Sequence, residues 1–268
     1  MLQTNTIQFC LGIDPNPNEY SFEKFNACVK NHMDAIDVLK SSLKQKFIKL
    51  NLAFFLSYGS RGIELLEQFT DRYRNEFTII LDGKFSEIAN SLQAYLSFVF
   101  NTLGAHGVTI NPFLGENTLR LAFETCVKKV GEKGRVYVLC VTSEGSTSAL
   151  AYLQENWRNK LIACAQIRDE VFTSQDNLKK CAGVVIGANK EDILFSEEVK
   201  ESGLSVLAPG LGVQGGEFRI LEKCLNFENE FTFPLSRSIF DGGNIPQNKV
   251  QENFLNIKSY FEGNNVKN

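Results

Sequence analysis

The 268-residue sequence predicts an α/β protein, a single (β/α)8 TIM barrel that spans residues 1–268 as one domain. Strand-like runs rich in β-branched and aromatic residues alternate with helix-like runs along the chain, and eight units of each kind can be distinguished. Alternation at this spacing indicates a parallel sheet, and the length matches the usual barrel of about 250 residues. No linker, low-complexity tract or shift in composition marks a boundary between domains.

The expected elements follow one another in order. Strands are expected at residues 8–14, 47–54, 77–84, 107–112, 136–142, 183–188, 205–209 and 231–234. Helices are expected at residues 21–43, 60–74, 88–103, 116–130, 146–162 with an extension through 180, 190–202, 217–225 and 246–261. An open doubly wound sheet is the structural alternative, but eight strands without a Gly-x-Gly-x-x-Gly fingerprint after the first favour a closed barrel.

The composition argues against several classes of function. The net charge is −3 and the basic residues are dispersed, so neither a nucleic-acid-binding nor a membrane-binding surface is predicted. The amino terminus lacks the basic region and long apolar core of a signal peptide, and no apolar run approaches the roughly 20 residues of a membrane span. We therefore expect a cytoplasmic protein.

The cysteines and histidines offer little for metal or nucleophilic chemistry. The seven cysteines form no Cys-x-x-Cys pair and several lie in apolar strand-like runs, so we expect buried, reduced thiols. His32 and His106 are the two histidines, too few for a His-rich metal site, and we expect no metal ion. His106 precedes an expected strand and is interpreted as a structural loop residue at the opposite end of the barrel.

Active sites of such barrels lie at the carboxyl ends of the strands, so the polar residues there are the candidates. Strand one ends in Asp14, which can accept a hydrogen bond from a sugar hydroxyl or cap the turn before Pro15. Strand two carries Lys49 and Asn51 on one face of a very apolar run. Because burying an unpaired ammonium is costly and a closed barrel has no edge strand, we expect Lys49 to be either paired or solvated.

Strand three ends in a cluster of charges. Alternation with period two places Asp82 and Lys84 on the same face of residues 77–84. The next helix is expected to begin near Ser86 and to carry Glu87 in its first turn. This junction would therefore present a carboxylate, an ammonium and another carboxylate, although a solvated salt-bridge network is the plainer interpretation.

The last strands carry features of a phosphate site. Residues 207–216 form a glycine-rich turn after strand seven, and Arg237 follows strand eight. Barrels commonly bind phosphate with the backbone N–H groups of these two loops, and an arginine adds a charge-assisted contact. After strand five, Ser143 offers a hydroxyl that can hydrogen-bond a polar ring.

These segments together resemble the longer, bacterial-type branch of the orotidine 5′-phosphate decarboxylase family. The resemblance rests on Leu-Gly-Ile-Asp-Pro (11–15), Lys-Leu-Asn-Leu-Ala-Phe-Phe (49–55), Asp-Gly-Lys-Phe-Ser-Glu-Ile (82–88), Val-Thr-Ile-Asn-Pro-Phe-Leu-Gly (108–115), Ala-Pro-Gly-Leu-Gly-Val-Gln-Gly-Gly (208–216) and Ser-Arg (236–237). It implies a cofactor-free, homodimeric barrel that converts orotidine 5′-monophosphate to uridine 5′-monophosphate in pyrimidine biosynthesis.

The resemblance also implies roles for individual residues. The family's charged tetrad corresponds to Lys49, Asp82, Lys84 and, contributed across the dimer interface, Glu87. Lys84 would protonate the ring carbon, Asp82 would lie near the departing carboxylate, and Lys49 would hold Asp82 and reach the ribose. The implied substrate contacts are Asp14, Asn51, Ser91, Ser143, Pro209, Gln214, Gly215, Gly216 and Arg237.

The chain departs from the family's pattern around strand three. Glu87 stands where the family has aspartate, and Phe85-Ser86 replaces the usual Arg-Gly. Further departures replace single residues of the motifs: Ser91 for threonine, Glu144 for asparagine and Leu56 for glutamate. A diverged homologue that binds a nucleotide or sugar phosphate without turnover is therefore one alternative. A metal-dependent sugar-phosphate decarboxylase is another, but that branch carries an acid on strand two, where this chain has Lys49.

Overall fold

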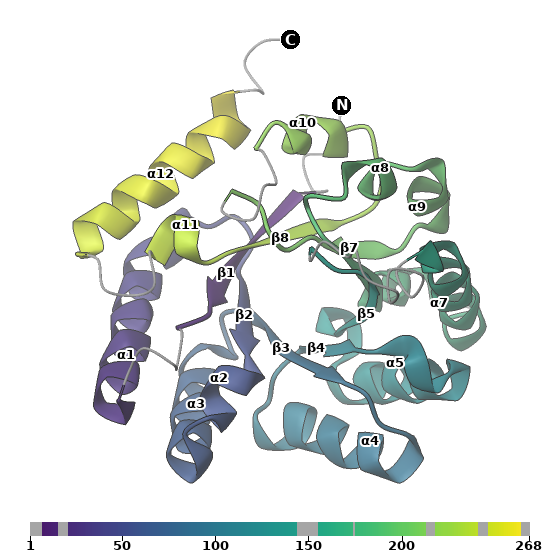
Figure 1. Ribbon diagram of the computed structural model, residues 1–268, viewed down its shortest axis with the longest axis horizontal. Coiled ribbons are helices and arrows are strands. Elements are labelled where there is room, and N and C mark those ends of the chain that lie inside the picture. The colour runs from purple at the N-terminus through teal and green to yellow at the C-terminus, as the bar shows by residue number, and fades with distance from the viewer. Residues whose placement is uncertain are drawn as a thin grey trace.

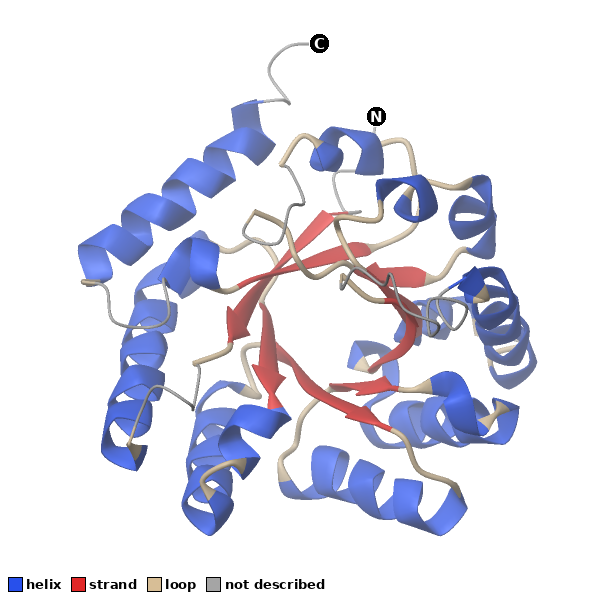
Figure 2. Ribbon diagram, in the orientation of Figure 1, coloured by secondary structure: helices blue, strands red, loops and turns tan. Residues whose placement is uncertain are grey.

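The computed structural model describes residues 7–15, 21–143, 155–173, 175–212, 218–240 and 246–263. These residues form a closed barrel of parallel strands in the order β1 to β8, with β8 paired to β1. Helices form a ring around the strands (Figures 1 and 2). The single (β/α)8 TIM barrel expected from the sequence is confirmed. That residues 1–268 all belong to one domain stays a prediction.

The bounds of the elements are as follows. The strands are β1 (Ile7–Ile13), β2 (Phe47–Asn51), β3 (Thr78–Phe85), β4 (Gly107–Ile110), β5 (Arg135–Val141), β6 (Ala182–Ile186), β7 (Ser205–Leu207) and β8 (Phe231–Leu235). The helices are α1 (Phe22–Leu39), α2 (Leu52–Leu56), α3 (Gly59–Tyr73), α4 (Ala89–Ser97), α5 (Glu116–Val130), α7 (Trp157–Val171), α8 (Glu191–Leu194), α9 (Glu197–Ser202), α10 (Ile220–Cys224), α11 (Arg237–Phe240) and α12 (Gln247–Gly263).

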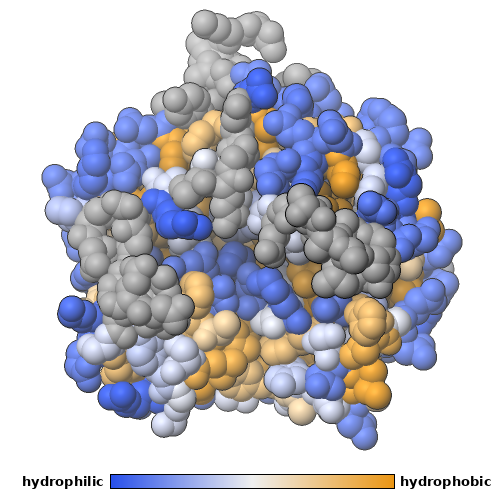
Figure 3. Space-filling view, viewed as in Figure 1, coloured by the Kyte–Doolittle hydropathy of each residue, from blue (hydrophilic) through white to orange (hydrophobic). Residues whose placement is uncertain are grey.

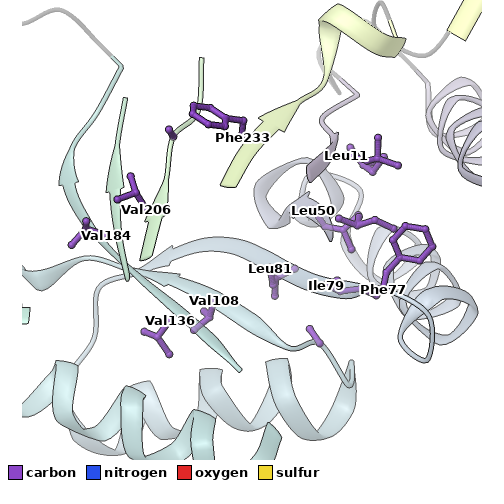
Figure 4. Close-up of a cluster of buried hydrophobic side chains, with 14 of the residues drawn as sticks. Leu11, Leu50, Phe77, Ile79, Leu81, Val108, Val136, Val184, Val206 and Phe233 are labelled. Atoms are coloured by element: carbon purple, nitrogen blue, oxygen red, sulfur yellow. The ribbon is translucent and has the colours of Figure 1, made fainter. Parts of the chain in front are cut away.

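Two buried apolar clusters follow from the alternation of side chains along the strands. The larger joins strand residues such as Leu50, Leu81 and Val108 to the surrounding helices (Figure 4). Burying one such side chain stabilises the fold by roughly 1.5–3 kcal/mol. The smaller cluster includes Cys10 and Ile80, whose alternation with Leu11 and Leu81 turns them toward the barrel axis. The site residues on β2 and β3 belong to this inward face.

A hydrogen-bonded group lies inside the barrel near the amino ends of β1, β5 and β8. The buried Thr232 hydroxyl donates to Gln8 Oε1 at 2.9 Å, and its oxygen lies 3.3 Å from the Tyr137 hydroxyl. We call Gln8, Tyr137 and Thr232 the barrel floor. Because buried polar groups must be paired, this group satisfies three side chains at the end of the barrel opposite the strands' carboxyl ends.

The structure corrects several expected boundaries. The strand expected at 47–54 ends at Asn51, because the Asn51 side chain accepts a hydrogen bond from the Ala53 N–H at 3.2 Å and so caps the short helix α2. The helix expected at 190–202 is split into α8 and α9, with Ser196 capping α9. Of the helix expected at 146–162 with an extension through 180, the structure shows α7, which ends at Val171, and a separate 3-10 helix at Asp176–Cys181.

The cysteines and the helices bear on two further expectations. All seven cysteines are buried, so none presents an accessible thiol in this fold. Within the described segments, no helix has both the length and the apolar character needed to cross a membrane.

Candidate active site

A cavity of about 580 Å³ opens at the carboxyl ends of the strands. Figure 3 shows hydrophilic side chains in the hollow near the centre of this face, with hydrophobic surface directly beneath it in the view. The predicted site residues that line the cavity are Asp14, Lys49, Asn51, Asp82, Lys84, Ser143, Pro209 and Arg237. These residues come from six strands or the loops that follow them, so closure of the barrel gathers them into one place.

Lys49 is the buried cation of the site. Its side chain is 7% exposed, and its ammonium Nζ lies 3.1 Å from Asp82 Oδ2 and 3.3 Å from Asp14 Oδ1. It projects from the inward face of β2, between Asp14 after β1 and Asp82 on β3. The two carboxylates provide the charged partners that a buried ammonium requires.

β3 leaves its regular pairing with β4 where the site begins. Leu81 pairs with Val108 and Phe85 with Ile110, so residues 82–84 of β3 lie opposite the single residue Thr109. Within this bulge Lys84 has a left-handed backbone conformation, with φ of 46°. The pairing with β4 is irregular here, but Asp82 and Lys84 both line the cavity, on the face where the expected alternation over residues 77–84 places them.

The bulge nevertheless brings the two charges together. Lys84 Nζ lies 2.7 Å from Asp82 Oδ1, although the Lys84 side chain is 51% exposed. The two side chains therefore lie on the same side of β3, although the backbone of Lys84 is left-handed. Lys49, Asp82 and Lys84 thus form a continuous chain of alternating charge that runs from the interior of the barrel to the open cavity.

The environment fixes the charges of the inner pair. Burial favours the neutral form of the Asp82 carboxyl, but the ammonium groups of Lys49 and Lys84, with hydrogen bonds from Lys84 and Thr109, outweigh it and lower the pKa of Asp82 to about 2. Burial also favours neutral Lys49, but the carboxylates of Asp14 and Asp82 raise the pKa of Lys49 above its ordinary value. At neutral pH an ionised Asp82 therefore faces a protonated Lys49.

Arg237 lines the same cavity from the end of β8, the strand next to β1. This exposed residue begins α11, directly after β8, and lines the cavity together with Pro209 from the loop after β7. Gly210 and Gly212 in that loop have φ of 101° and 87°, which glycine adopts without strain. Gln214, Gly215 and Gly216, predicted to bind phosphate, lie outside the described residues.

Glu87 and Ser91 do not line this cavity in the described part of the chain. The helix expected to begin near Ser86 begins instead at Ala89, and Glu87 lies before it and not in its first turn. The reason is that β3 continues to Phe85, whose buried ring stacks on Tyr95 with centroids 4.5 Å apart. Ile88 has an extended backbone, and its carbonyl accepts the first bonds of the helix.

The carboxylates of the site are arranged around an ammonium. Lys49 Nζ contacts the carboxylates of both Asp14 and Asp82. A divalent cation in this cavity would need the same two carboxylates as ligands. Among the described residues, no group of three or more His, Cys, Asp or Glu side chains is placed to hold a metal ion. The donor set of this cavity therefore fits a cation supplied by the chain itself.

Thr109 is a site residue that the sequence analysis did not single out. Its hydroxyl donates to Asp82 Oδ1 at 2.8 Å and accepts from the Lys84 backbone N–H at 2.9 Å. The signal was present, because period two places Thr109 on the inward face of the strand next to Asp82. Its importance depends on the bulge, which the residue pattern alone does not reveal.

Comparisons with known proteins agree with this geometry. A family model described as "Orotidine 5'-phosphate decarboxylase / HUMPS family" matches residues 8–219. The orotidine 5′-phosphate decarboxylases of Dehalococcoides mccartyi (strain CBDB1) and Roseiflexus castenholzii are each 28% identical to the chain over 221 residues, covering 80% of it and 76% and 75% of the relatives. The OMP decarboxylase structure from Leishmania donovani matches with a TM-score of 0.67 at 20% identity, covering 95% of this chain and 93% of that one. This last likeness is one of fold.

Proposed function

The chain belongs to the orotidine 5′-phosphate decarboxylase / HUMPS family, and we propose that it converts orotidine 5′-monophosphate to uridine 5′-monophosphate and CO2 in de novo pyrimidine biosynthesis. Both curated relatives described above carry the decarboxylase name, which favours this branch of the family. The expected cytoplasmic location stays a prediction.

The reaction must support a carbanion without a cofactor. The bond between the ring carbon C6 and the carboxylate carbon breaks, CO2 leaves, and the electron pair stays on C6. The Lys84 ammonium donates its proton to C6, and this step completes uridine 5′-monophosphate. Asp82 lies beside the departing carboxylate and holds Lys84, since Lys84 Nζ is 2.7 Å from its Oδ1. The ammonium therefore stabilises negative charge as it develops on C6.

The other lining residues bind the rest of the substrate. Lys49 fixes Asp82 and, together with Asp14, reaches the ribose hydroxyls from the inner side of the cavity. Asn51, Ser143 and Pro209 line the walls around the sugar and the ring. Arg237 binds the phosphate with Gln214, Gly215 and Gly216. Binding energy from the phosphate, remote from the reacting carbon, can be used to lower the barrier there.

The observation that carries the proposal is the chain of contacts from Lys49 through Asp82 to Lys84. A cavity for binding alone needs no ammonium held 2.7 Å from a carboxylate whose pKa is about 2. A metal-dependent sugar-phosphate enzyme needs its carboxylates for the cation, and here the Lys49 ammonium lies 3.3 Å and 3.1 Å from Asp14 and Asp82. Both facts favour metal-independent proton transfer to carbon.

Turnover by the purified protein tests the function directly. We expect uridine 5′-monophosphate and CO2 in equal amounts from orotidine 5′-monophosphate, unchanged by a chelator, and no turnover by Lys84→Ala. Lys223→Ala is a matched control, since Lys223 Nζ also lies 2.7 Å from a carboxylate, that of Glu191, and is 52% exposed. Loss of activity with chelator would favour the metal-dependent branch. Tight nucleotide binding without turnover would favour a diverged binding protein.

A homodimer that shares its active sites belongs to the same proposal. Exposed hydrophobic side chains occur on three neighbouring connections, those after β2, β3 and β4: Leu56, Ile88, Tyr95, Phe113 and Leu114. Phe113 is 76% exposed and Ile88 is 58% exposed, which is unusual for large apolar side chains that have no partner. Glu87 lies on the connection after β3 and does not line the cavity of its own chain. A second copy that docks on these three connections would receive the Glu87 carboxylate in its own cavity.

A further inference from the structure

The bulge between β3 and β4 lies opposite Thr109. Residues 82–84 of β3 lie opposite Thr109 alone, and Lys84 has φ of 46°. A left-handed backbone is unfavourable for a residue with a Cβ, so the surrounding structure must hold Lys84 in place. The ladder resumes beyond it, where the Asn111 N–H donates to the Phe85 carbonyl at 2.9 Å. The irregularity is therefore confined to the segment that carries the two charged residues.

The directions of the two Thr109 hydrogen bonds are fixed by chemistry. The Lys84 backbone N–H can only donate, so Thr109 Oγ1 accepts from it at 2.9 Å. The ionised Asp82 carboxylate can only accept, so the Thr109 hydroxyl donates its hydrogen to Oδ1 at 2.8 Å. Asp82 Oδ1 is the same oxygen that Lys84 Nζ contacts at 2.7 Å. One hydroxyl thus joins the backbone of Lys84 to the carboxylate that receives the Lys84 side chain.

Aromatic packing holds the bulge from its other side. Phe85 is buried and stacks on Tyr95, and a Cβ added to Gly83 would lie 2.5 Å from the Phe85 ring. Gly83 therefore fits beneath that ring because it lacks a side chain. This packing fixes the end of the bulge but contacts neither charge, so Thr109 is the link between the bulge and the charged pair.

We propose that Thr109 is a positioning residue for decarboxylation, which sets the Lys84 ammonium against Asp82 by bonding both the Lys84 backbone and the Asp82 carboxylate. This inference rests on the proposed function, because it assigns Thr109 a part in placing the proton donor. Thr109 is 1% exposed, so bulk water does not replace its hydroxyl. Removing the hydroxyl leaves the Lys84 backbone N–H without its acceptor and takes from Asp82 Oδ1 one of its two donors, the other being Lys84 Nζ.

Three variants test the proposal. Thr109→Val keeps the shape of the side chain and removes the hydroxyl, Thr109→Ser keeps the hydroxyl, and Thr232→Val removes a buried hydroxyl from the barrel floor. Misplacement of a catalytic group by about 1 Å can cost on the order of a hundredfold in rate. We expect Thr109→Val to lower kcat at least about tenfold with KM within about threefold, Thr109→Ser to recover most of kcat, and Thr232→Val to keep both constants. Thr109→Ala replaces Thr109→Val, with the same expectation, if the valine variant does not fold.

Crystal structures of the parent and the Thr109 variants provide a readout that does not depend on activity. We expect Lys84 Nζ to move out of hydrogen-bonding distance of Asp82 in Thr109→Val and to stay in place in Thr109→Ser. An unmoved Lys84 in Thr109→Val, or equal kcat losses in Thr109→Val and Thr232→Val, would overturn the inference. If the parent releases no uridine 5′-monophosphate, the proposed function fails, while the position of Lys84 in the variant crystals still decides whether Thr109 holds it.

Discussion

Lys49 and Asp82 are bonded diagonally across β2 and β3 and not as register partners. The register partner of Lys49 is Ile80, and that of Asp82 is Asn51, yet Lys49 Nζ lies 3.1 Å from Asp82 Oδ2. Ile80 lies one layer deeper in the barrel than Asp82. The Lys49 side chain therefore extends past Ile80 toward the carboxyl ends of the strands, and its ammonium lies at the inner side of the cavity. The apolar layer that includes Ile80 lies beneath the charges, so the ammonium is shielded from water and depends on carboxylates for its stability.

Lys49→Met should destabilise the folded protein by on the order of 3 kcal/mol, because removing one partner leaves the buried Asp82 carboxylate undercompensated. The same substitution in an Asp82→Asn background should cost clearly less, since the carboxylate that needs Lys49 is absent there. Free energies of unfolding in urea measure both costs. Equal costs in the two backgrounds would mean that the pair does not contribute to stability.

The sequence predicted the architecture because the barrel repeats one local pattern. Apolar runs with strand composition recur at a spacing that leaves room for a helix between them. Eight such units are the number that closes a parallel barrel. Boundaries were less accurate where the same residues suit either structure. The apolar residues 52–56 continue the strand pattern of residues 47–51 and form α2 only because Asn51 caps their first turn.

The site was predictable to the extent that its residues lie at strand ends. The apolar surroundings of Lys49 alone indicate that it is either paired or solvated, and the structure pairs it with Asp14 and Asp82. The contact between Asp82 and Lys84 agrees with the expected alternation, since both side chains line the cavity. The bulge and the left-handed Lys84 could not be predicted, because they are tertiary features with no periodic signal.

Arg237→Ala should weaken uridine 5′-monophosphate binding by about 1.5–3 kcal/mol, the scale of a lost charge-assisted hydrogen bond. Uridine, which lacks the phosphate, should bind the variant and the parent alike. Isothermal titration with the two ligands measures the difference. Arg74→Ala is a suitable control, because Arg74 follows the last turn of α3 and does not line the cavity. Its guanidinium lies 3.2 Å from the Asp71 carboxylate. Equal affinity of Arg237→Ala and the parent for the monophosphate would refute the phosphate site.

Stability should fall as the pH is lowered from about 6.5 to 4, because His106 resists protonation in the folded state. Burial and, secondarily, the charge of Lys133 lower the pKa of His106 from 6.5 to about 4. Its Nδ1 also accepts a hydrogen bond from the Ile79 N–H at 3.2 Å, which protonation at Nδ1 would break. Between these pH values the unfolded chain binds a proton that the folded chain does not, so the loss reaches up to about 3 kcal/mol.

Unfolding free energies at several pH values between 4.5 and 7 test this linkage. His106→Asn keeps an acceptor for the Ile79 N–H but does not titrate, so its stability should depend less on pH than that of the parent. The pKa of His32 is also lowered by burial, so the variant should retain part of the dependence. If the free energy of unfolding changes with pH to the same extent in the parent and in His106→Asn, then His106 titrates in the folded chain as it does in the unfolded chain.

Glu87 should act in the site of a partner subunit. Glutamate is one methylene longer than the family's aspartate, and the neighbouring Phe85 and Ser86 differ from the family's pattern as well. Phe85 packs on Tyr95, so the backbone two residues before Glu87 is held by a contact of the residue that replaces the family's arginine. We therefore expect this backbone to suit the longer side chain. Glu87→Asp should lower turnover, and Glu87→Ala should lower it further. A faster Glu87→Asp variant would mean instead that the glutamate is a defect.

Mixing two inactive variants decides whether the sites are shared. Lys84→Ala removes the proton donor and Glu87→Ala removes the carboxylate, so a dimer with one chain of each keeps one complete site if Glu87 reaches across the interface. An equal mixture that exchanges subunits freely should then recover about a quarter of the parental turnover per chain, because half of the dimers are mixed and each has one working site. Subunit exchange is followed separately by energy transfer between dyes on the two chains. Exchange without recovery would place Glu87 in its own chain's site or outside catalysis altogether.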